Sequence, residues 1–261
     1  MLLRSLLVLS SIAPLCIAQL SWKTPGVCIS PTGTLCRTLV YEESGWANRS
    51  WGFHAVDRYT DRITEAVRSD GAALLRIAHR SFKFYLISSE SFDRSRVILP
   101  LERRTVEIEH SVKEVRDMGG VWSFNEFWSD TRIDDENCSG RATMVGEKWR
   151  RTGKEPVVGG IRGIEYVYAT PDNRIEQRIA FAPSLGCTAV AFSLSTRSSA
   201  GMPVSEQRLR LVTATLAEPD QALFAIPKEY RLTGPARSWP YICMDKFPGD
   251  ITGSAFSKVV P

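Results

Sequence analysis

Short runs in which apolar and polar residues alternate recur along most of the chain and dominate its hydrophobic pattern. Alternation with a period of two is typical of a β-strand with one covered face. In Thr105–His110, for example, Val106 and Ile108 lie on the same side of such a strand. The other expected strands are Phe82–Ile87, Arg94–Leu99, Ile164–Ala169, Arg174–Phe181, Thr188–Ser195 and Gln207–Leu216.

Clusters of turn-forming residues separate these runs, for example at Thr170–Asn173, Pro183–Gly186 and Ser198–Pro203. Short strands with turns between them indicate an antiparallel sheet that curls into a sandwich or a partial barrel. The pattern lacks the strand–helix–strand alternation of a parallel dinucleotide-binding fold. The sequence therefore predicts a mainly antiparallel β protein with minor α content (α+β), built as a curved half-barrel or partial barrel.

Residues 54–79 fit two structures. Apolar residues recur there at helical spacing, and Gly71 could cap such a helix at its C-terminal end. Asp70-Gly71 is also the strongest short hairpin signal, with Arg62–Ser69 and Ala72–His79 as its two strands. We favour the hairpin, whose covered face would carry Ile63, Val67, Leu75 and Ile77.

Residues 1–18 have the pattern of a secretory signal peptide. Met1–Arg4 supply a positive charge, Ser5–Leu15 form a short apolar run, and small residues precede the expected cleavage at Ala18-Gln19. The apolar run is shorter than the roughly 20 residues that a membrane-spanning helix needs. We therefore expect a secreted or periplasmic protein with no transmembrane segment after cleavage.

The rest of the chain divides into three expected parts. Residues 19–53 predict an irregular N-terminal segment that contains a short strand at Leu35–Tyr41. Residues 54–233 form the expected β domain. Its less regular middle is a loop or a short helix that covers the open side of the sheet. Residues 234–261 hold four prolines and three glycines and predict an irregular tail.

Export, if it occurs, determines how the six cysteines are interpreted. Removal of the signal peptide takes away Cys16, and an oxidising compartment favours disulfides among the remainder. Cys28 and Cys36 flank the turn-forming Pro31–Gly33, so a small loop closed by these two is plausible. Spacing alone leaves the pairing open for the five that remain: Cys28, Cys36, Cys138, Cys187 and Cys243.

Composition excludes several classes of protein. Eighteen glycines and fourteen prolines are ordinary counts, which exclude a collagen. A hydrophobic fraction of 43% can fill a core and argues against general disorder. The net charge of +4 comes from 33 basic and 29 acidic residues that are well mixed, so we expect no nucleic-acid partner.

Catalytic and metal-binding motifs are weak. His54, His79 and His110 are far apart and lack the spacing of a metal site. Neither a Gly-x-Ser-x-Gly nor a Ser-x-x-Lys motif is present. A dense acidic patch lies in a polar stretch typical of a solvated loop; it consists of Asp130, Asp134, Asp135 and Glu136. We expect no catalytic residue, metal or cofactor, and hence no enzyme.

An aromatic run in the middle of the chain is the candidate binding feature; it consists of Trp122, Phe124, Phe127 and Trp128. On the concave face of a partial barrel these rings would line an apolar pocket. The alternative is that they are ordinary core or cover an open edge of the sheet.

Two motifs carry a family resemblance. Ala182–Cys187 reads APSLGC, and Glu218–Tyr230 reads EPDQALFAIPKEY. An APxLG segment followed by EPDxxLFxIPxxY resembles uncharacterised exported bacterial proteins, which are distantly similar to the periplasmic lipoprotein-carrier superfamily. The resemblance implies a half-barrel closed over by helices, with a lipid or another apolar ligand in the concave face. It also implies a disulfide between Cys138 and Cys187, and it carries no catalytic residues across.

The second motif also has a physical interpretation of its own. Leu223 and Phe224 can plug the apolar bottom of a barrel, and Pro227 can end the strand. This is a structural role and does not define a site.

The leading functional hypothesis is an exported, non-enzymatic protein that binds an apolar ligand in a concave face. One alternative is a structural or interaction module of the cell envelope. The other is a hydrolase whose acid–base pair is brought together by the fold from a carboxylate and a distant histidine, His79 or His110.

Overall fold

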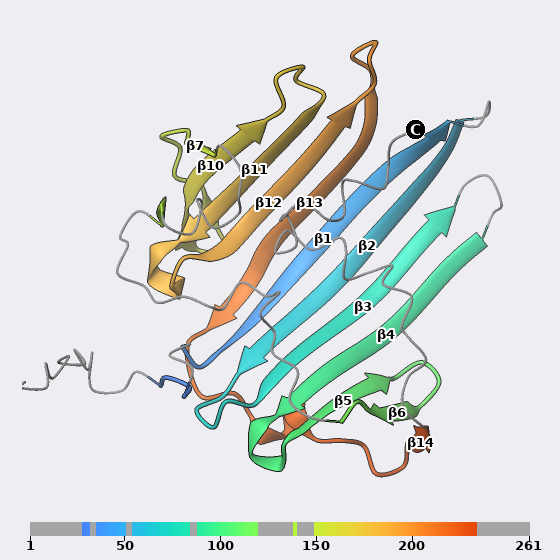
Figure 1. Ribbon diagram of the computed structural model, residues 1–261, viewed down its shortest axis with the longest axis vertical. Coiled ribbons are helices and arrows are strands. Elements are labelled where there is room, and N and C mark those ends of the chain that lie inside the picture. Colours follow the sequence, from blue (N-terminus) through green and yellow to red (C-terminus); the bar gives the residue numbers. More distant parts are fainter. Residues whose placement is uncertain are drawn as a thin grey trace, which may run out of the picture.

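A computed structural model describes residues 28–31, 35–50, 54–83, 88–119, 138–139 and 149–233. They form an open, curled sheet of twelve strands and a separate two-stranded hairpin (Figure 1). The order across the sheet is β14-β6-β5-β4-β3-β2-β1-β13-β12-β11-β10-β7. Neighbouring strands are antiparallel except β14 and β6, so the predicted mainly antiparallel, curled sheet is confirmed.

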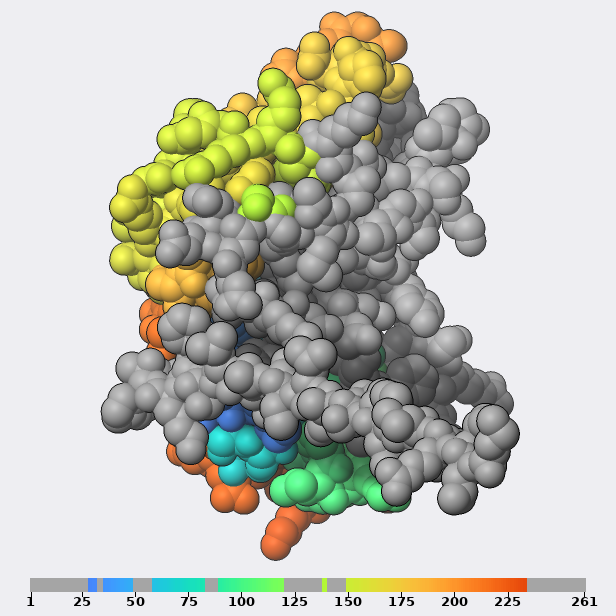
Figure 2. Space-filling view, turned by 60° about the vertical axis from the view of Figure 1, so that its left-hand side comes forward, coloured from blue at the N-terminus to red at the C-terminus, as the bar shows by residue number. Residues whose placement is uncertain are grey.

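The central strands are long, and those at both edges are short. The strands are β1 Arg37–Ser50, β2 His54–Val67, β3 Ala73–Lys83, β4 Ser88–Leu99, β5 Arg104–Glu109, β6 Glu114–Asp117, β7 Arg150–Arg151, β8 Val157–Val158, β9 Ile161–Arg162, β10 Ile164–Ala169, β11 Ile175–Ala182, β12 Thr188–Arg197, β13 Pro203–Thr215 and β14 Arg231–Thr233. β8 and β9 form the separate hairpin, and Figure 2 shows the yellow-green residues of this region on the surface.

The ambiguous range 54–79 is a hairpin, as favoured from the sequence. β2 and β3 pair in register, with Ile63 opposite Ile77. Gly71 has a φ of +84°, in the left-handed region that glycine adopts readily, and it lies in the turn closed by a bond from the Arg68 N–H to the Ala72 carbonyl. The four side chains expected on the covered face are all buried.

The structure corrects the expected N-terminal segment 19–53. Its residues Arg37–Ser50 form β1, a strand at the centre of the sheet, between β2 and β13. The Gly- and Ser-containing second half looked irregular by composition, but hydrogen bonds to both neighbours hold it extended. Gly45 leaves room there for the ring of Tyr59, which would have to shift if a Cβ were present.

One expected strand is tested only in part, and one further expectation needs correction. Phe82 and Lys83 of the expected strand Phe82–Ile87 end β3, and residues 84–87 lie outside the described part. The α content is barely present: the helical segments named in the described ranges are the 3₁₀ turns η1 Pro100–Glu102, η2 Pro183–Leu185 and η3 Gln221–Phe224. Left-handed residues, Arg103 and Gly186, end the first two of these after one turn.

The two faces of the sheet differ in character. One face, here called the core face, carries a large cluster of buried apolar side chains that includes Leu39, Tyr41, Ile63, Ile179 and Leu211. Because side chains alternate along a strand, the residues between these point to the opposite face. That face is here called the groove face, and over its centre it carries Glu42, Arg62, Arg80, Arg208 and Arg210.

A second apolar cluster covers one end of the groove face. Strands β2 to β6 contribute Ala66, Leu74, Val97 and Val106, and the segment after β13 lays Phe224 on them. Phe224 is 4% exposed, whereas Leu223 is 44% exposed. Of the two residues predicted to plug the apolar end, Phe224 therefore does so and Leu223 does not.

Two disulfides cross-link the described chain. Cys138 is joined to Cys187 within the large core cluster, and this is the pairing implied by the family resemblance. Cys28 is joined to Cys36 in a loop of sequence separation 8. Cys243 and Cys16 lie outside the described residues.

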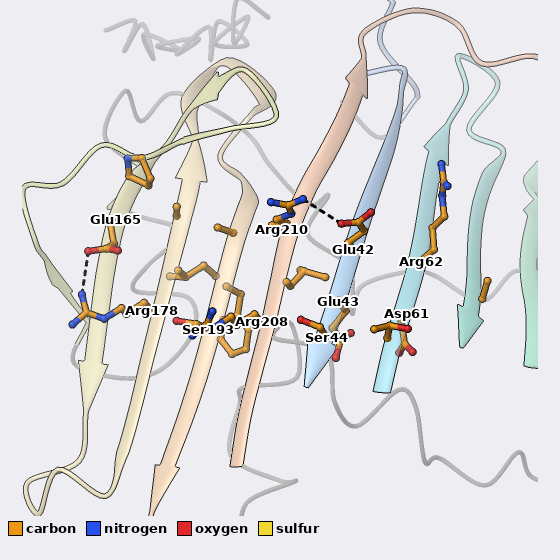
Figure 3. A pocket seen from close by; sticks show the side chains of 18 of the residues that line it. Glu42, Glu43, Ser44, Asp61, Arg62, Glu165, Arg178, Ser193, Arg208 and Arg210 are labelled. Carbon is orange, nitrogen blue, oxygen red and sulfur yellow. Dashed lines mark hydrogen bonds and ion pairs between the residues drawn. The ribbon is translucent and has the colours of Figure 1, made fainter. Parts of the chain in front are cut away.

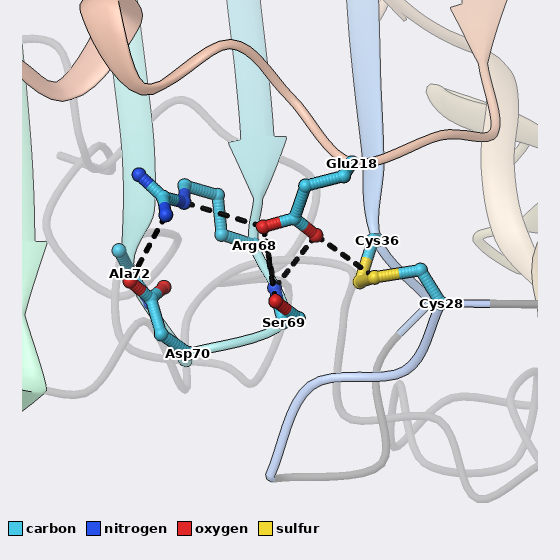
Figure 4. The surroundings of a disulfide bond; sticks show 7 residues. All are labelled: Cys28, Cys36, Arg68, Ser69, Asp70, Ala72 and Glu218. Carbon is cyan, nitrogen blue, oxygen red and sulfur yellow. Dashed lines mark hydrogen bonds and ion pairs between the residues drawn. A yellow bond between two sulfur atoms is a disulfide. The ribbon is translucent and has the colours of Figure 1, made fainter.

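The acidic residues of the EPD motif have structural partners, and Figure 4 shows those of Glu218. Glu218 accepts hydrogen bonds from the backbone N–H of Ser69 at 3.0 Å and from its hydroxyl at 3.0 Å, and it pairs with Arg68. It also lies 2.8 Å from the Sγ atom of Cys28. Asp220 caps η3 by accepting from the Ala222 N–H. The motif therefore fastens the segment after β13 to the β2–β3 turn.

Candidate functional site

A hollow of about 880 Å³ lies on the groove face (Figure 3). Residues of β3, β2, β1, β13, β12, β11 and β10 line it, and Pro156, which directly precedes β8, borders it. Three small side chains, Ala78, Ala180 and Ala191, leave room between longer charged ones. We take this hollow, here called the groove, as the candidate site.

Strand register places one line of hydrogen-bond donors across the groove. Thr60 lies between Arg80 and Ser44, Ser44 lies opposite Arg208, and Ser193 lies between Arg208 and Arg178. This line is here called the donor row, and it consists of Arg80, Thr60, Ser44, Arg208, Ser193 and Arg178. Guanidinium groups and hydroxyls together are a donor set suited to phosphate, sulfate or carboxylate.

Carboxylates lie beside the donor row and pair with its arginines. Arg178 contacts Glu176 at 2.8 Å and Glu165 at 3.4 Å, and Arg208 contacts Glu206 at 2.6 Å. The hydrogen bond that Arg178 donates to Glu176 raises the pKa of Arg178. These pairs are partly exposed to solvent, so they stabilise the fold little. Arg208 is the more accessible of the two arginines.

Two arginines in the groove are not neutralised by an ion pair within the described ranges. Arg210 pairs with Glu42 at 3.3 Å, whereas Arg62 and Arg80 are exposed and have no such partner there. Figure 3 shows Arg62 beside the Arg210–Glu42 pair, on the neighbouring strand. Arg62 and Arg80 are therefore the positive charges of the groove that ion pairs in the described ranges leave open to an anion.

The residues predicted to bind a ligand lie elsewhere in the chain. Trp122, Phe124, Phe127 and Trp128 are all outside the described residues, and so is the acidic patch at Asp130–Glu136. The prediction of an apolar aromatic pocket therefore stays a prediction.

His79 has a carboxylate within hydrogen-bond distance, as the hydrolase alternative requires. Its Nδ1 lies 2.5 Å from Oδ1 of Asp61, and its ring stacks on Phe92 at 4.6 Å. These side chains belong to the core face; Asp61 borders the groove, whereas His79 does not line it. The arrangement resembles a structural pair more than an accessible acid–base pair.

His110 lies in a second cluster, at the end of β5. Its Nε2 is 2.7 Å from the Oγ of Ser95, and its Nδ1 is 3.4 Å from the hydroxyl of Tyr230. Ser95 is 4% exposed, so a substrate could not reach its hydroxyl without a change in structure. This cluster links β4 and β5 to the segment that follows η3. The hydroxyl of Tyr230 thus belongs to this structural cluster.

Replacing His110 with glutamine is expected to remove an acid-sensitive part of the stability. Burial lowers the pKa of His110 below its ordinary value of 6.5, against the nearby charge of Asp93, which raises it. The unfolded chain therefore takes up this proton at higher pH than the folded chain. The free energy of unfolding then falls as the pH drops through about 6.5, and the contribution is fully present above it.

Urea denaturation at a series of pH values between about 7.5 and 5 measures this effect in both proteins. The Asp93 carboxyl does not interfere, because its hydrogen bond with Arg76 lowers its pKa below 3.8. A His110→Gln variant whose stability falls as steeply with acidification as that of the natural protein would contradict the prediction.

The groove arginines were not recognised as a site from the sequence. Arg208 and Arg210 alternate with apolar residues, which is also the pattern of an ordinary solvent-facing strand. The signal that distinguishes them is their alignment with Arg80 and Arg178 on other strands. That alignment depends on pairings between residues distant in sequence, including a register shift between Val40 and Tyr41 in β1.

Within the described ranges, none of the helices has the length and apolar character needed to cross a membrane.

Comparisons with known proteins give only distant likenesses. No family model matches the chain. No curated protein matches it either. A solved structure of PNGF-II is 9% identical with a TM-score of 0.32, over 76% of this chain and 31% of that chain, so this chain spans about a third of that protein.

Two smaller solved structures are also similar. A β-barrel-like protein of the domain of unknown function DUF1849 from Brucella abortus is 10% identical, with a TM-score of 0.25, over 74% of this chain and all of that one. An outer membrane lipoprotein-sorting protein domain from Vibrio parahaemolyticus is 10% identical, with a TM-score of 0.18, over 72% and 89%. At such TM-scores, none of these likenesses identifies the function of this chain.

Proposed function

We propose that this chain is a non-enzymatic, extracytoplasmic binding module that holds an anionic ligand in its groove. The observation that carries the proposal is the donor row, which brings three arginines and three hydroxyls to the edge of a hollow of about 880 Å³. Arg62 lies beside the row, and neither Arg62 nor Arg80 forms an ion pair with a carboxylate in the described ranges. An anion in the groove would neutralise the unpaired arginines and accept hydrogen bonds from the donor row.

An extracytoplasmic location is supported by two independent features. The chain contains two disulfides, which persist in oxidising compartments. Residues 1–18 have the signal-peptide pattern. N-terminal sequencing of the protein recovered from the periplasm or the medium tests this part, and a chain that still begins at Met1 would contradict it.

The proposed ligand is anionic, whereas the sequence predicted an apolar one. The groove offers alanines as its small apolar contacts, and an apolar ligand there would remove water from arginine side chains without replacing their hydrogen bonds. A lipid or another apolar ligand would have to use the aromatic run at Trp122–Trp128. Mass spectrometry of lipids that copurify with the protein tests that separate proposal.

Arg208→Gln is expected to weaken the binding of tripolyphosphate about tenfold, because it removes the guanidinium at the centre of the donor row. Isothermal titration calorimetry measures the dissociation constant. The matched control is Lys228→Gln, which removes one positive charge from an exposed side chain outside the groove. The binding should also weaken as salt rises from about 50 to about 200 mM.

Two results would contradict the proposed function. One is the absence of tripolyphosphate binding at low salt. The other is an equal loss of affinity in the Arg208→Gln and Lys228→Gln variants, which would show that the anion responds to net charge and not to the groove. Circular dichroism of both variants verifies that the sheet is intact.

A further inference from the structure

We propose that the natural ligand is an extended polyanion, a chain that carries phosphate or sulfate groups and lies across the strands along the donor row. This inference rests on the proposed function and adds the shape of the ligand and its path. It follows from the separation of the three arginines and from the position of the carboxylates.

The three arginines of the donor row are too far apart for one small anion. Neighbouring strands in a sheet lie about 4.8 Å apart. Arg80 on β3 and Arg208 on β13 are three strand positions apart, and Arg178 on β11 is two further positions away. The row is therefore about 24 Å long when measured along the sheet. A single phosphate cannot contact all three guanidinium groups at once, whereas a chain that follows the row can.

Hydroxyl groups fill the positions between the arginines. Thr60 and Ser44 lie between Arg80 and Arg208, and Ser193 lies between Arg208 and Arg178. Each hydroxyl can donate one hydrogen bond to an anion oxygen. Every strand from β3 to β11 thus contributes a donor to the row, so a ligand that follows it meets no gap.

Acidic side chains lie on both sides of the donor row and not within it. Two residues further along their strands, Glu42 and Glu165 lie on one side, and Glu206 and Glu176 lie on the other. An anion displaced toward Glu206 and Glu176 would approach carboxylates, which repel it. On the other side, Arg62 and Arg210 flank Glu42, so positive and negative side chains alternate there. The donor row is the line across these strands that carries arginines with no carboxylate among them, which suits a single chain of anionic groups.

A nucleic acid fits this surface less well than a simple polyanion. Proteins that bind single strands combine basic grooves with aromatic rings on which the bases stack. The donor row has no aromatic residue. Trp46, on the same face of β1, donates to Glu206 at 3.4 Å and does not belong to the row. The row recognises charge and spacing, and not bases.

The experiment compares the full-length protein with anions of increasing length. Calorimetric titrations use inorganic phosphate, tripolyphosphate, and polyphosphate chains shorter and longer than the row of about 24 Å. A parallel series uses sulfated glucan oligomers of matching lengths. Affinity is expected to rise at least tenfold from tripolyphosphate to a chain that spans the row, and to change little beyond that length. Tighter binding of one series identifies phosphate or sulfate as the anionic group.

Substitutions locate the path of the chain. Arg80→Gln removes one end of the row, so it should weaken the long chain about tenfold and tripolyphosphate less than threefold. Arg58→Gln is the matched control, because Arg58 is an exposed arginine on the same face of β2 but outside the row. It should change the affinity for the long chain less than threefold.

The outcomes separate this inference from the proposed function. Equal affinity for all lengths, with the Arg208→Gln effect retained, would overturn the extended ligand and leave the anion site in place. Equal losses in Arg58→Gln and Arg80→Gln would overturn the row as the path. Tighter binding of oligothymidylate than of polyphosphate of equal length would assign the groove to nucleic acid. Absence of binding by every anion would overturn both proposals.

Discussion

Glu65→Ala is expected to lower the free energy of unfolding by about 3–5 kcal/mol, because it leaves the charge of Arg37 buried without its counterion. Arg37 is 0% exposed and Glu65 is 6% exposed. Their side chains meet at 2.8 Å on the core face. An exposed pair would contribute far less, so the size of the effect depends on this burial.

The other contacts of Arg37 cannot replace Glu65. The guanidinium donates to the hydroxyl of Thr188 at 2.7 Å and to the carbonyl of Leu185 at 3.2 Å, both in or next to β12. These partners are neutral, and the Nε atom of Arg37 has no hydrogen-bond partner. Without Glu65, no negative charge would compensate the guanidinium in this set of contacts.

The matched control is the double variant Arg37→Met and Glu65→Leu, which replaces both charges by apolar side chains of similar size. It is expected to recover most of the stability lost by Glu65→Ala, because neither charge is then buried alone. Urea denaturation with an unchanged m-value measures both variants. A double variant as unstable as Glu65→Ala would show that packing, and not charge, accounts for the loss.

Replacing Cys138 and Cys187 together with alanine is expected to lower the free energy of unfolding by about 4 kcal/mol. The bond closes a loop of sequence separation 49, and loss of this constraint increases the entropy of the unfolded chain. Both residues belong to the large core cluster, where alanine leaves no unpaired polar group. Denaturation under non-reducing conditions measures the change.

The second disulfide supplies the internal comparison. Cys28 and Cys36 close a loop of sequence separation 8, so their joint replacement with alanine should cost about 2.5 kcal/mol on the same chain-entropy estimate. The order of the two effects is the test. A larger loss from the Cys28 and Cys36 pair would mean that contacts around that bond, such as the one with Glu218, outweigh loop entropy.

Local patterns predicted much of the sheet. The alternation in Thr105–His110 and the turn at Asp70-Gly71 are properties of a few adjacent residues, and both gave the correct element. β1 was harder, because Ser44–Ser50 has a loop-like composition and is extended only by pairing with β2 and β13. A strand stabilised by its neighbours carries a weak signal in its own sequence.

The candidate site depends on relations that the sequence does not display. Strand pairing across the middle of the sheet places Arg80, Arg208 and Arg178 in one row. Arg37 and Glu65 look like surface residues, since charged side chains are almost never fully buried unless they are paired. Sequence reasoning found the fold class because that depends on periodicity, and it missed the groove because that depends on register.

The short strands at the two edges of the sheet have a consequence for self-association. A long exposed edge offers unpaired backbone groups to another chain and invites polymerisation. Here the outermost strands are the two-residue β7 and the three-residue β14, and arginines occupy both, at Arg150, Arg151 and Arg231. Within the described part of the chain, β1, β2, β12 and β13 have a neighbour on both sides, whereas Ser88–Phe92 of β4 pair with β3 alone. Growth into fibres would therefore have to start from this short stretch of β4, because the outermost strands offer little template.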